Sequence, residues 1–438
     1  MLLITGGYIM DPSSGTEGKR DIVVQKDRIK AIADEGEGRK IALEAAAKVG
    51  EILEEIDASG KVVAPGLVDC HVHFRDPGFT YKEDIYSGAR AAARGGFTTV
   101  VMMGNTNPHM DNPETIKEAI NKGKETGINV LCCGNVTKDM LGKELVDMKA
   151  LKDAGAVLFT DDGVPVLDRD LMKKALGTAA ELDMTISLHE EDPKYISQNG
   201  INAGEVARKL GIEGSPRDAE ISMVKRDIEL AEDTGGSIVV QHISAAESVE
   251  LIRQARKRWV RVFAEATPHH FTLTEDAVLE KGSLAKMNPP LRLESDRQAI
   301  IEGLKDGTID MIATDHAPHS KEEKDREITK APSGITGLET SLALGIRELV
   351  DKGHLDLMTL LERMTCGPAD VYGLNAGTLW ERGRADMVIF DPREEWVFDK
   401  SVSKASNTPF LGEKLPGKIY YTICRGVVVY KSESTGEE

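Results

Sequence analysis

The chain has 438 residues, of which 40% are hydrophobic and 29% are charged, the proportions of a globular protein with a sizeable core. A formal net charge of −18 and an aromatic content of only 5% disfavour a nucleic-acid partner, which needs positive charge and stacking surfaces. No stretch approaches the roughly 18 uninterrupted apolar residues of a membrane helix, and the first residues lack the features of a signal peptide, so we expect no membrane partner.

The five cysteines are odd in number and scattered, and none is spaced as CxxC. This pattern favours free thiols in a reducing compartment over a disulfide framework or a thiolate zinc site. We therefore expect a cytoplasmic protein of enzyme size. The cysteines are Cys70, Cys132, Cys133, Cys366 and Cys424.

Short β-strands are predicted at both ends of the chain, where apolar and polar residues alternate and β-branched and aromatic side chains are frequent. Neither group is long enough for a good core alone, so we expect residues 1–66 and 375–438 to pair into one small β domain. An Ala/Glu/Leu-rich stretch at 41–56 has a helical period, which predicts a surface helix inserted in a hairpin. The predicted strands cover 2–11, 21–33, 61–66, 385–391, 395–399 and 418–430.

Residues 67–374 alternate short apolar runs with helical stretches, a pattern typical of βα units around a parallel sheet. Eight such units in about 300 residues favour a TIM-type (β/α)8 barrel. An open doubly wound sheet is disfavoured because no GxGxxG follows the first strand. The predicted strands cover 66–73, 98–105, 129–136, 156–162, 185–190, 237–244, 260–270 and 310–316, and helices are predicted at 82–96, 113–127, 169–183 and 216–236.

Side chains that can bind a metal stand at the ends of most of these barrel strands. In a parallel barrel the carboxyl ends of the strands meet on the face that carries active sites. Residues i and i+2 of a strand face the same side, so both histidines of HVH can reach one ion. Imidazole and carboxylate without thiolate favour Zn²⁺, with Mn²⁺, Fe²⁺ and Co²⁺ as alternatives. The residues are His71, His73, Asp161, Asp162, His189, His242 and Asp315.

Each of these residues alone has a simpler explanation. Histidines at strand ends are often partly exposed or merely hydrogen-bonded, and an aspartate such as Asp315 also serves as a helix N-cap. Their coincidence at strand ends that one barrel brings together favours a metal centre. His269 and His316 are expected to be structural and are left out of the site.

The chain resembles class I dihydroorotases of the amidohydrolase superfamily in the runs HVHFRDPGFTYKED, GGFTTVVMMGNTNP, FTDDG, EATPHH, MNPPLR and ATDHAPHS. The resemblance extends over nearly the whole chain. It implies the reversible ring closure of N-carbamoyl-L-aspartate to L-dihydroorotate, the third step of de novo pyrimidine synthesis. It also implies a zinc-dependent barrel flanked by a β-sandwich that is built from both termini.

Carried over by position, the resemblance implies one or two zinc ions per chain. His71, His73 and Asp315 would bind the more buried ion. His189 and His242 would bind the second, and Asp162 would be shared between the two. The implied substrate-binding residues are His73, Arg75, Asn105, Asn288, His319, Ser333 and Gly334.

Two positions depart from the family pattern. This chain has Gly104 where many members have proline, and Ser333 where many have phenylalanine. Neither departure removes a polar ligand.

The chemistry suits these residue types. A metal lowers the pKa of its bound water, so a metal-bound hydroxide is available near about pH 7 to attack the ring carbonyl. Asp315 would take the hydroxide proton and pass it to the leaving nitrogen, first as general base and then as general acid. Arg75 offers a planar fork of donors to the substrate carboxylate. Recognition must be local, because a net charge of −18 does not attract an anion.

The segment SKEEKDREITKAPSG, which follows His319, is highly charged and almost without apolar anchors. We expect either a solvated surface loop or a lid that closes on the substrate through its two ends.

The nearest alternative functions are those of other cyclic-amide hydrolases, allantoinase and dihydropyrimidinase or hydantoinase. These enzymes usually carry a carboxylated lysine on the fourth strand, whereas AVLFTDDG has none and the preceding Lys152 belongs to a predicted helix. A non-catalytic barrel partner of aspartate transcarbamoylase is a further alternative, which the complete ligand set disfavours. A homodimer and an association with aspartate transcarbamoylase are both compatible with catalysis.

Overall fold

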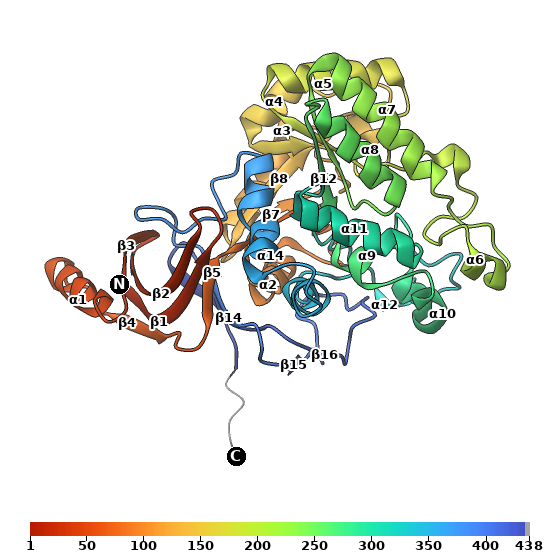
Figure 1. Ribbon diagram of the computed structural model, residues 1–438. Coiled ribbons are helices and arrows are strands. Elements are labelled where there is room, and N and C mark those ends of the chain that lie inside the picture. Colours follow the sequence, from red (N-terminus) through yellow and green to blue (C-terminus); the bar gives the residue numbers. More distant parts are fainter. Residues whose placement is uncertain (434–438) are drawn as a thin grey trace.

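The computed structural model describes residues 1–433 and contains a parallel and a mixed eight-stranded sheet. In the parallel sheet, the neighbours follow chain order from β6 to β13. Its first and last strands approach each other through a parallel bridge between Val72 and His316, and the His73 N–H donates to the His316 carbonyl at 2.8 Å. The sheet is therefore a nearly closed barrel with helices around it (Figure 1).

The barrel strands are short and almost entirely buried, because a parallel sheet covered by helices faces apolar groups on both sides. Their bounds are β6 (Leu67–Val72), β7 (Phe97–Met102), β8 (Asn129–Gly134), β9 (Ala156–Phe159), β10 (Thr185–Leu188), β11 (Ser237–Val240), β12 (Val262–Ala266) and β13 (Met311–Ile312). The eight predicted strands are thus all present.

Helices begin where the sequence supplies caps. Asp84 and Asn112 accept hydrogen bonds from the N–H groups of Ser87 and Thr115, at the starts of α2 and α3. The helices of the barrel are α2 (Ile85–Arg94), α3 (Pro113–Lys124), α4 (Met148–Ala154), α5 (Arg169–Glu181), α6 (Glu205–Leu210), α7 (Asp218–Thr234), α8 (Ala246–Lys257), α9 (Pro268–Thr272), α10 (Ala277–Lys281), α11 (Glu294–Asp306), α12 (Lys321–Lys324), α13 (Ser341–Gly345), α14 (Leu357–Met364) and α15 (Cys366–Val371).

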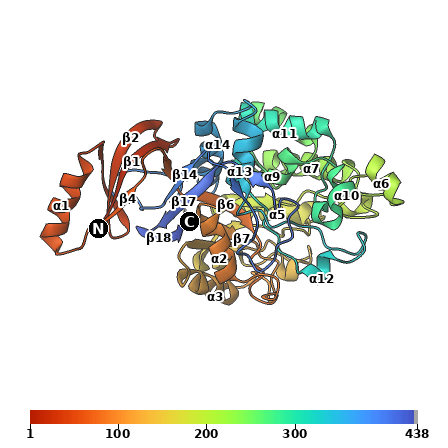
Figure 2. The same cartoon turned by 90° about the horizontal axis from the view of Figure 1, so that it is seen from below.

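The mixed sheet joins the two ends of the chain, as predicted. Its central contact is the antiparallel pair of β5 and β14, one from each end, and the sheet lies beside the barrel (Figure 2). The strand order is β18-β17-β14-β5-β1-β2-β3, with β4 pairing β1. The bounds are β1 (Leu2–Asp11), β2 (Thr16–Gln25), β3 (Arg28–Asp34), β4 (Glu54–Asp57), β5 (Val62–Pro65), β14 (Met387–Asp391), β17 (Lys418–Cys424) and β18 (Val427–Lys431).

The fold class is confirmed, and four element boundaries are corrected. The stretches 21–33 and 418–430 are each divided into two strands, by turns at Lys26–Asp27 and Arg425–Gly426. The helix predicted at 41–56 is α1 (Gly38–Val49); it stops at Gly50, whose left-handed φ of 69° ends the helix, and the following residues form β4. The strand predicted at 260–270 ends at Ala266, because Thr267 caps α9 by accepting a hydrogen bond from the His270 N–H.

The predicted division into 1–66 with 375–438 and 67–374 stays a prediction. The N-terminal strands of the mixed sheet end at Pro65, and the first barrel strand begins at Leu67. One part of the C-terminal region leaves the mixed sheet: residues 398–413 run between β15 (Trp396–Val397) and β16 (Lys414–Leu415) and contact the barrel.

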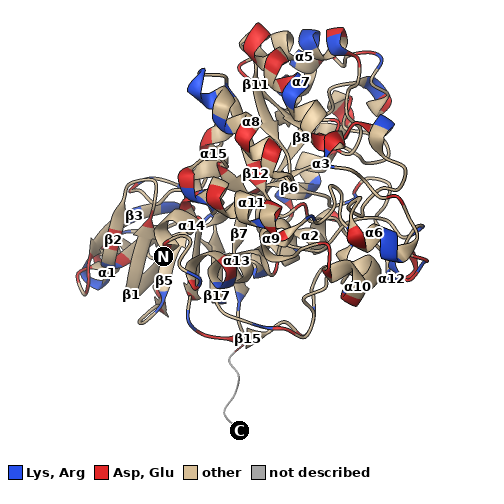
Figure 3. Cartoon of the chain, turned by 45° about the vertical axis from the view of Figure 1, so that its right-hand side comes forward, with Lys and Arg blue, Asp and Glu red and all other residues tan. Residues whose placement is uncertain are grey.

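The surface charges are mixed in sign. Lysine and arginine are interspersed with aspartate and glutamate over the outer helices in the view of Figure 3. Among residues 1–433, no helix combines the length and the apolar character needed to cross a membrane.

Candidate active site

The predicted metal-binding side chains converge at the carboxyl ends of the barrel strands. His71 lies in β6 and His73 follows it, while Asp315 follows β13, the neighbour that closes the barrel. His73 Nε2 and His71 Nε2 lie 3.0 and 3.5 Å from the same atom, Asp315 Oδ1. These three residues form one group that could hold a metal ion.

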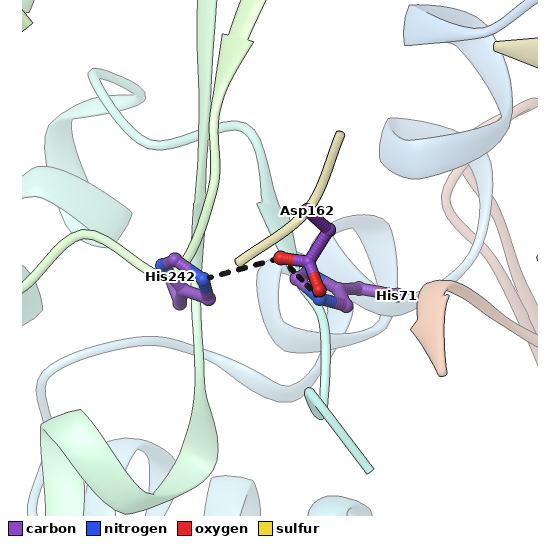
Figure 4. Close-up of side chains that lie close together, drawn as sticks. All are labelled: His71, Asp162 and His242. Atoms are coloured by element: carbon purple, nitrogen blue, oxygen red, sulfur yellow. Dashed lines mark ion pairs between the residues drawn. The ribbon is translucent and has the colours of Figure 1, made fainter. Parts of the chain in front are cut away.

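Asp162, which follows β9, lies at the centre of the second group. Its Oδ1 is 3.5 Å from His71 Nε2, 3.8 Å from His242 Nε2 and 3.7 Å from His189 Nδ1. Figure 4 shows the Asp162 carboxylate between the imidazoles of His71 and His242. His189 and His242 follow β10 and β11, and their facing nitrogens are only 3.0 Å apart. The structure therefore brings the side chains of all six predicted ligands together in one cluster.

The donor atoms are arranged to bind a metal ion and do not fully satisfy one another by hydrogen bonding. His71 Nε2 is buried and has no hydrogen-bond partner among residues 1–433, although two carboxylate oxygens lie 3.5 Å away. A buried imidazole nitrogen without a partner is costly in a protein interior. Imidazole and carboxylate donors at strand ends suit Zn²⁺.

Charges within this cluster depend on one another. Burial disfavours the charge of Asp162, but the charge of His71 and the nearby imidazoles of His189 and His242 outweigh it and hold the Asp162 pKa well below its usual range. Burial also opposes a charge on His71, yet Glu265 and Asp162 raise its pKa well above normal. Against burial, the nearby carboxylates of Asp162 and Glu191 raise the pKa of His189 to about 10. A bound cation would replace the protons that these imidazoles carry.

Two glutamates that sequence reasoning missed orient the histidines. Glu265 Oε1 lies 2.6 Å from His71 Nδ1 and accepts a hydrogen bond from the His242 N–H at 3.2 Å. Glu191 Oε2 lies 3.1 Å from His189 Nε2. Metal-binding histidines usually pair their second ring nitrogen with such a carboxylate. The available signal was a glutamate in β12, inside the run EATPHH, on a strand that contributes no ligand.

Asp161 and Asp162 point in different directions, as predicted for neighbours near a strand end. Asp161 accepts hydrogen bonds from the N–H groups of Val136 and Thr137 at 2.8 and 3.1 Å, and from the Thr137 hydroxyl. It therefore holds the loop that follows β8 and does not face the histidines.

Three residues of the site have a left-handed backbone. Arg75, His242 and Asp315 have φ values of 58°, 32° and 46°. Side chains other than glycine rarely adopt this conformation, and it is retained mainly where a function needs the side chain in one direction. The strain supports a common role for these residues.

A pocket opens above the cluster. Of the predicted substrate residues, six line it: His73, Arg75, Asn105, Asn288, Ser333 and Gly334. His319 does not line it; its ring lies behind Gly334, with Nδ1 3.4 Å from Lys82 Nζ.

The pocket offers unpaired donors and acceptors to a polar ligand. Arg75 donates through Nε to the Pro318 carbonyl at 3.3 Å, and within residues 1–433 its Nη atoms make no hydrogen bond. Asn288 lies with Nδ2 3.3 Å from His189 Nε2, and its Oδ1 has no partner in the same range. Asn105 is more occupied, because it contacts His73 Nδ1 at 3.0 Å and donates to Asp162 Oδ2 at 3.3 Å.

Known proteins match this chain over its whole length. The family model for Dihydro-orotase-like proteins matches residues 60–248. A dihydroorotase of Clostridioides difficile is 55% identical over 432 residues, which is 99% of this chain and 100% of the relative. A dihydroorotase of Clostridium acetobutylicum is 47% identical over 435 residues, with the same coverage. The chain belongs to the dihydroorotase family.

The predicted family and function are thereby confirmed, and this dihydroorotase is a cyclic-amide hydrolase enzyme. Among solved structures, an L-hydantoinase (dihydropyrimidinase) from Arthrobacter aurescens superimposes with a TM-score of 0.85 at 25% identity, covering 98% of this chain and 96% of that one. Strand β9 of this dihydroorotase contains no lysine, and Lys152 lies in α4, where it donates to the Leu182 carbonyl.

The structure explains one of the two departures from the family pattern. A Cβ at Gly104 would lie 2.8 Å from Asn135 Nδ2, so this dihydroorotase fills with an amide the space that a side chain at 104 would need. Ser333 has its hydroxyl directed at Gly200, where a Cβ would meet it. The segment after His319 has few apolar anchors: Ala331 is buried in it, together with the polar Lys324. The predicted lid stays a prediction.

Proposed function

We propose that this protein interconverts N-carbamoyl-L-aspartate and L-dihydroorotate with one or two zinc ions, in de novo pyrimidine synthesis. The observation that supports this best is the pocket itself, in which an arginine with free Nη groups faces a cluster of imidazoles and carboxylates. The substrate has the matching parts, a carboxylate and a cyclic amide.

The proposed zinc ligands are the six residues of the cluster. His71, His73 and Asp315 would hold the more buried ion, and His189 and His242 the other. Asp162 lies between both groups and would be the shared carboxylate. When bound, zinc would supply Lewis-acid activation of water and of the ring carbonyl.

Asp315 is the proposed proton carrier. Burial disfavours its charge, but the hydrogen bond from His73 and the charge of His71 outweigh it and lower its pKa below the usual range. The carboxylate is therefore ionised and can accept the proton that the attacking water loses. The bond between ring carbonyl carbon and ring nitrogen breaks, and Asp315 returns the proton to that nitrogen. Ring closure is the reverse sequence.

The remaining pocket residues are proposed to hold the substrate. Arg75 would pair in bidentate fashion with the carboxylate, since its Nη groups are free. Asn105 and Asn288 present amides, and His73, Ser333 and Gly334 complete the wall. His319 does not line the pocket and lies behind Gly334; we propose that it contacts the part of the substrate that extends past that residue. Burial and the charges of Arg75 and Lys82 lower its pKa to about 2, so its ring is neutral.

A direct assay tests the proposal. Loss of dihydroorotate is followed by its absorbance near the ultraviolet edge, with allantoin and hydantoin as control substrates. We expect turnover of dihydroorotate alone, in protein that elemental analysis shows to contain zinc. Faster turnover of either control would contradict the assignment.

Location and assembly are further proposals. All five cysteines are buried and free, which supports a cytoplasmic location. A homodimer and an association with aspartate transcarbamoylase are also proposed; size-exclusion chromatography with and without that enzyme tests both.

A further inference from the structure

Residues 317–336, here called the substrate loop, form one wall of the pocket with little regular structure of their own. The only helix in them is the four-residue α12. The two stems of the loop lie side by side, because the Ala317 N–H donates to the Ile335 carbonyl at 2.7 Å. Regular secondary structure therefore does not fix Ser333 and Gly334, and their position depends on side-chain contacts.

Asn407 ties the two stems together. Its side chain is buried, with an exposed fraction of 4%. Oδ1 accepts a hydrogen bond from the His319 N–H at 2.9 Å, and Nδ2 donates to the carbonyls of Ala317 and Gly334, both at 3.0 Å. The Asn407 carbonyl accepts a further bond from the Thr336 N–H at 3.0 Å. One side chain thus connects both ends of the substrate loop.

The segment that carries Asn407 is itself fixed to the barrel. It belongs to the excursion between β15 and β16 (Figure 1). The Lys404 N–H donates to Glu83 Oε1 at 3.2 Å, and the Ser403 hydroxyl donates to the same carboxylate. Glu83 Oε2 lies 3.4 Å from His316 Nε2, next to Asp315 in the chain. The segment that carries Asn407 is therefore connected, through Glu83 and His316, to the end of the barrel that carries Asp315.

Lys324 holds the same carbonyl from the other side. Its Nζ donates to the carbonyls of Pro332 and Gly334 at 2.9 and 3.1 Å, and its side chain is only 3% exposed. Lys286 acts in parallel, donating to the carbonyls of Ile328 and Ala331. No carboxylate pairs with either ammonium group within residues 1–433, and burial, with the charge of Lys286, lowers the Lys324 pKa to about 7. Such groups are costly to bury, which argues that they are kept for a function.

The backbone at position 334 requires glycine. Its φ of 133° is in the region that favours glycine, and a Cβ there would lie 2.9 Å from the Ala317 carbonyl oxygen. Two donors from opposite sides fix the direction of its carbonyl, and with it the Ser333–Gly334 peptide that lines the pocket.

We propose that Asn407 and Lys324 are positioning residues of the reaction, which set the Ser333–Gly334 turn and His319 for the anionic ring of the substrate. This inference rests on the proposed function. Neither residue lines the pocket, so both act through the loop.

The experiment compares two variants with matched controls. Asn407→Asp keeps the acceptor for the His319 N–H but turns a donor to two carbonyls into a repelling oxygen. Lys324→Met removes the donor at nearly constant shape. The controls are Lys321→Met, on the same helix with an 80% exposed side chain, and Asn121→Asp, exposed on α3.

Turnover of dihydroorotate is measured per zinc-loaded site, well below each unfolding midpoint. Both variants are expected to lower kcat/KM about 10- to 100-fold, mainly through KM, with zinc content unchanged. Hydrogen exchange of peptides covering the substrate loop should rise in both variants and in neither control. A merely structural role would lower the unfolding midpoint and leave kcat/KM per site unchanged, which would overturn the inference.

The two proposals fail differently. Active wild type with unchanged Asn407→Asp and Lys324→Met overturns the positioning role alone. Wild type that does not turn over dihydroorotate overturns the proposed function and the catalytic role built on it. Unchanged hydrogen exchange in both variants overturns the anchoring of the loop, whatever the activity.

Discussion

The barrel strand ends and the substrate loop hold their functional groups by different means. At the strand ends, backbone hydrogen bonds between neighbouring strands fix the residues, and side chains such as His71 and Asp162 project from that frame. In the substrate loop, buried side chains hold backbone carbonyls: Asn407 comes from outside the loop and Lys324 from within it. The reacting groups thus lie in or next to hydrogen-bonded strands, and the recognition groups lie on a loop that side-chain contacts position.

Metal removal should have the largest effect on activity, because it disables the reacting groups at the strand ends and leaves the substrate loop in place. We expect about one or two zinc equivalents per chain, complete loss of activity on chelation, and recovery with added zinc, since every proposed ligand is histidine or carboxylate. Elemental analysis and the dihydroorotate assay measure this. Full activity in metal-free protein would contradict the proposed chemistry.

Asp315→Asn should lower kcat by about 10²–10⁴-fold while substrate still binds, because an amide cannot accept the proton from water. Steady-state kinetics at full zinc loading checks this result. If the variant keeps more than about a tenth of the wild-type kcat, Asp315 is only a ligand or a cap.

Asp162 and Asp161 provide a matched pair on one strand end. Asp162→Ala should lose a metal or most of the rate, since its carboxylate lies within 3.8 Å of four imidazoles. Asp161→Ala should be milder, because it only frees the loop at Val136 and Thr137. Zinc content and kcat decide between them. Activity should not depend on bicarbonate; rescue by bicarbonate, or the reverse order of severity, would refute the assignment.

Arg75→Met tests substrate recognition rather than the reacting groups at the strand ends. Losing hydrogen bonds to a charged partner should raise KM for dihydroorotate by about 10- to 100-fold. The dihydroorotate/dihydrouracil selectivity is the sharper measurement, because dihydrouracil lacks the carboxylate. An unchanged selectivity would exclude Arg75 as the carboxylate clamp.

Glu265→Gln should have the smallest effect, weakening zinc affinity by about 10- to 100-fold with little change in kcat of the loaded enzyme. The amide still fills the space but no longer provides a negative partner for His71. Zinc competition with a chelator measures the affinity. Unchanged affinity would make Glu265 a packing residue.

Sequence reasoning performed best where the relevant pattern is local. The eight strands, the polar residues at their ends and the different directions of Asp161 and Asp162 follow from alternation and from strand geometry. The ends of α1 and β12 were wrong because a single residue, Gly50 or Thr267, outweighed the longer pattern.

The sequence by itself determined which groups supply the chemistry, because each ligand stands at the end of its own strand and the barrel brings those ends together. Only the tertiary structure decided what orients them. Glu265 meets His71 across 194 residues of chain, and Asn407 meets Gly334 across 73. Hydrogen bonds are short and directional, so these partners are defined by the folded positions of two distant segments, which no local pattern of either segment records.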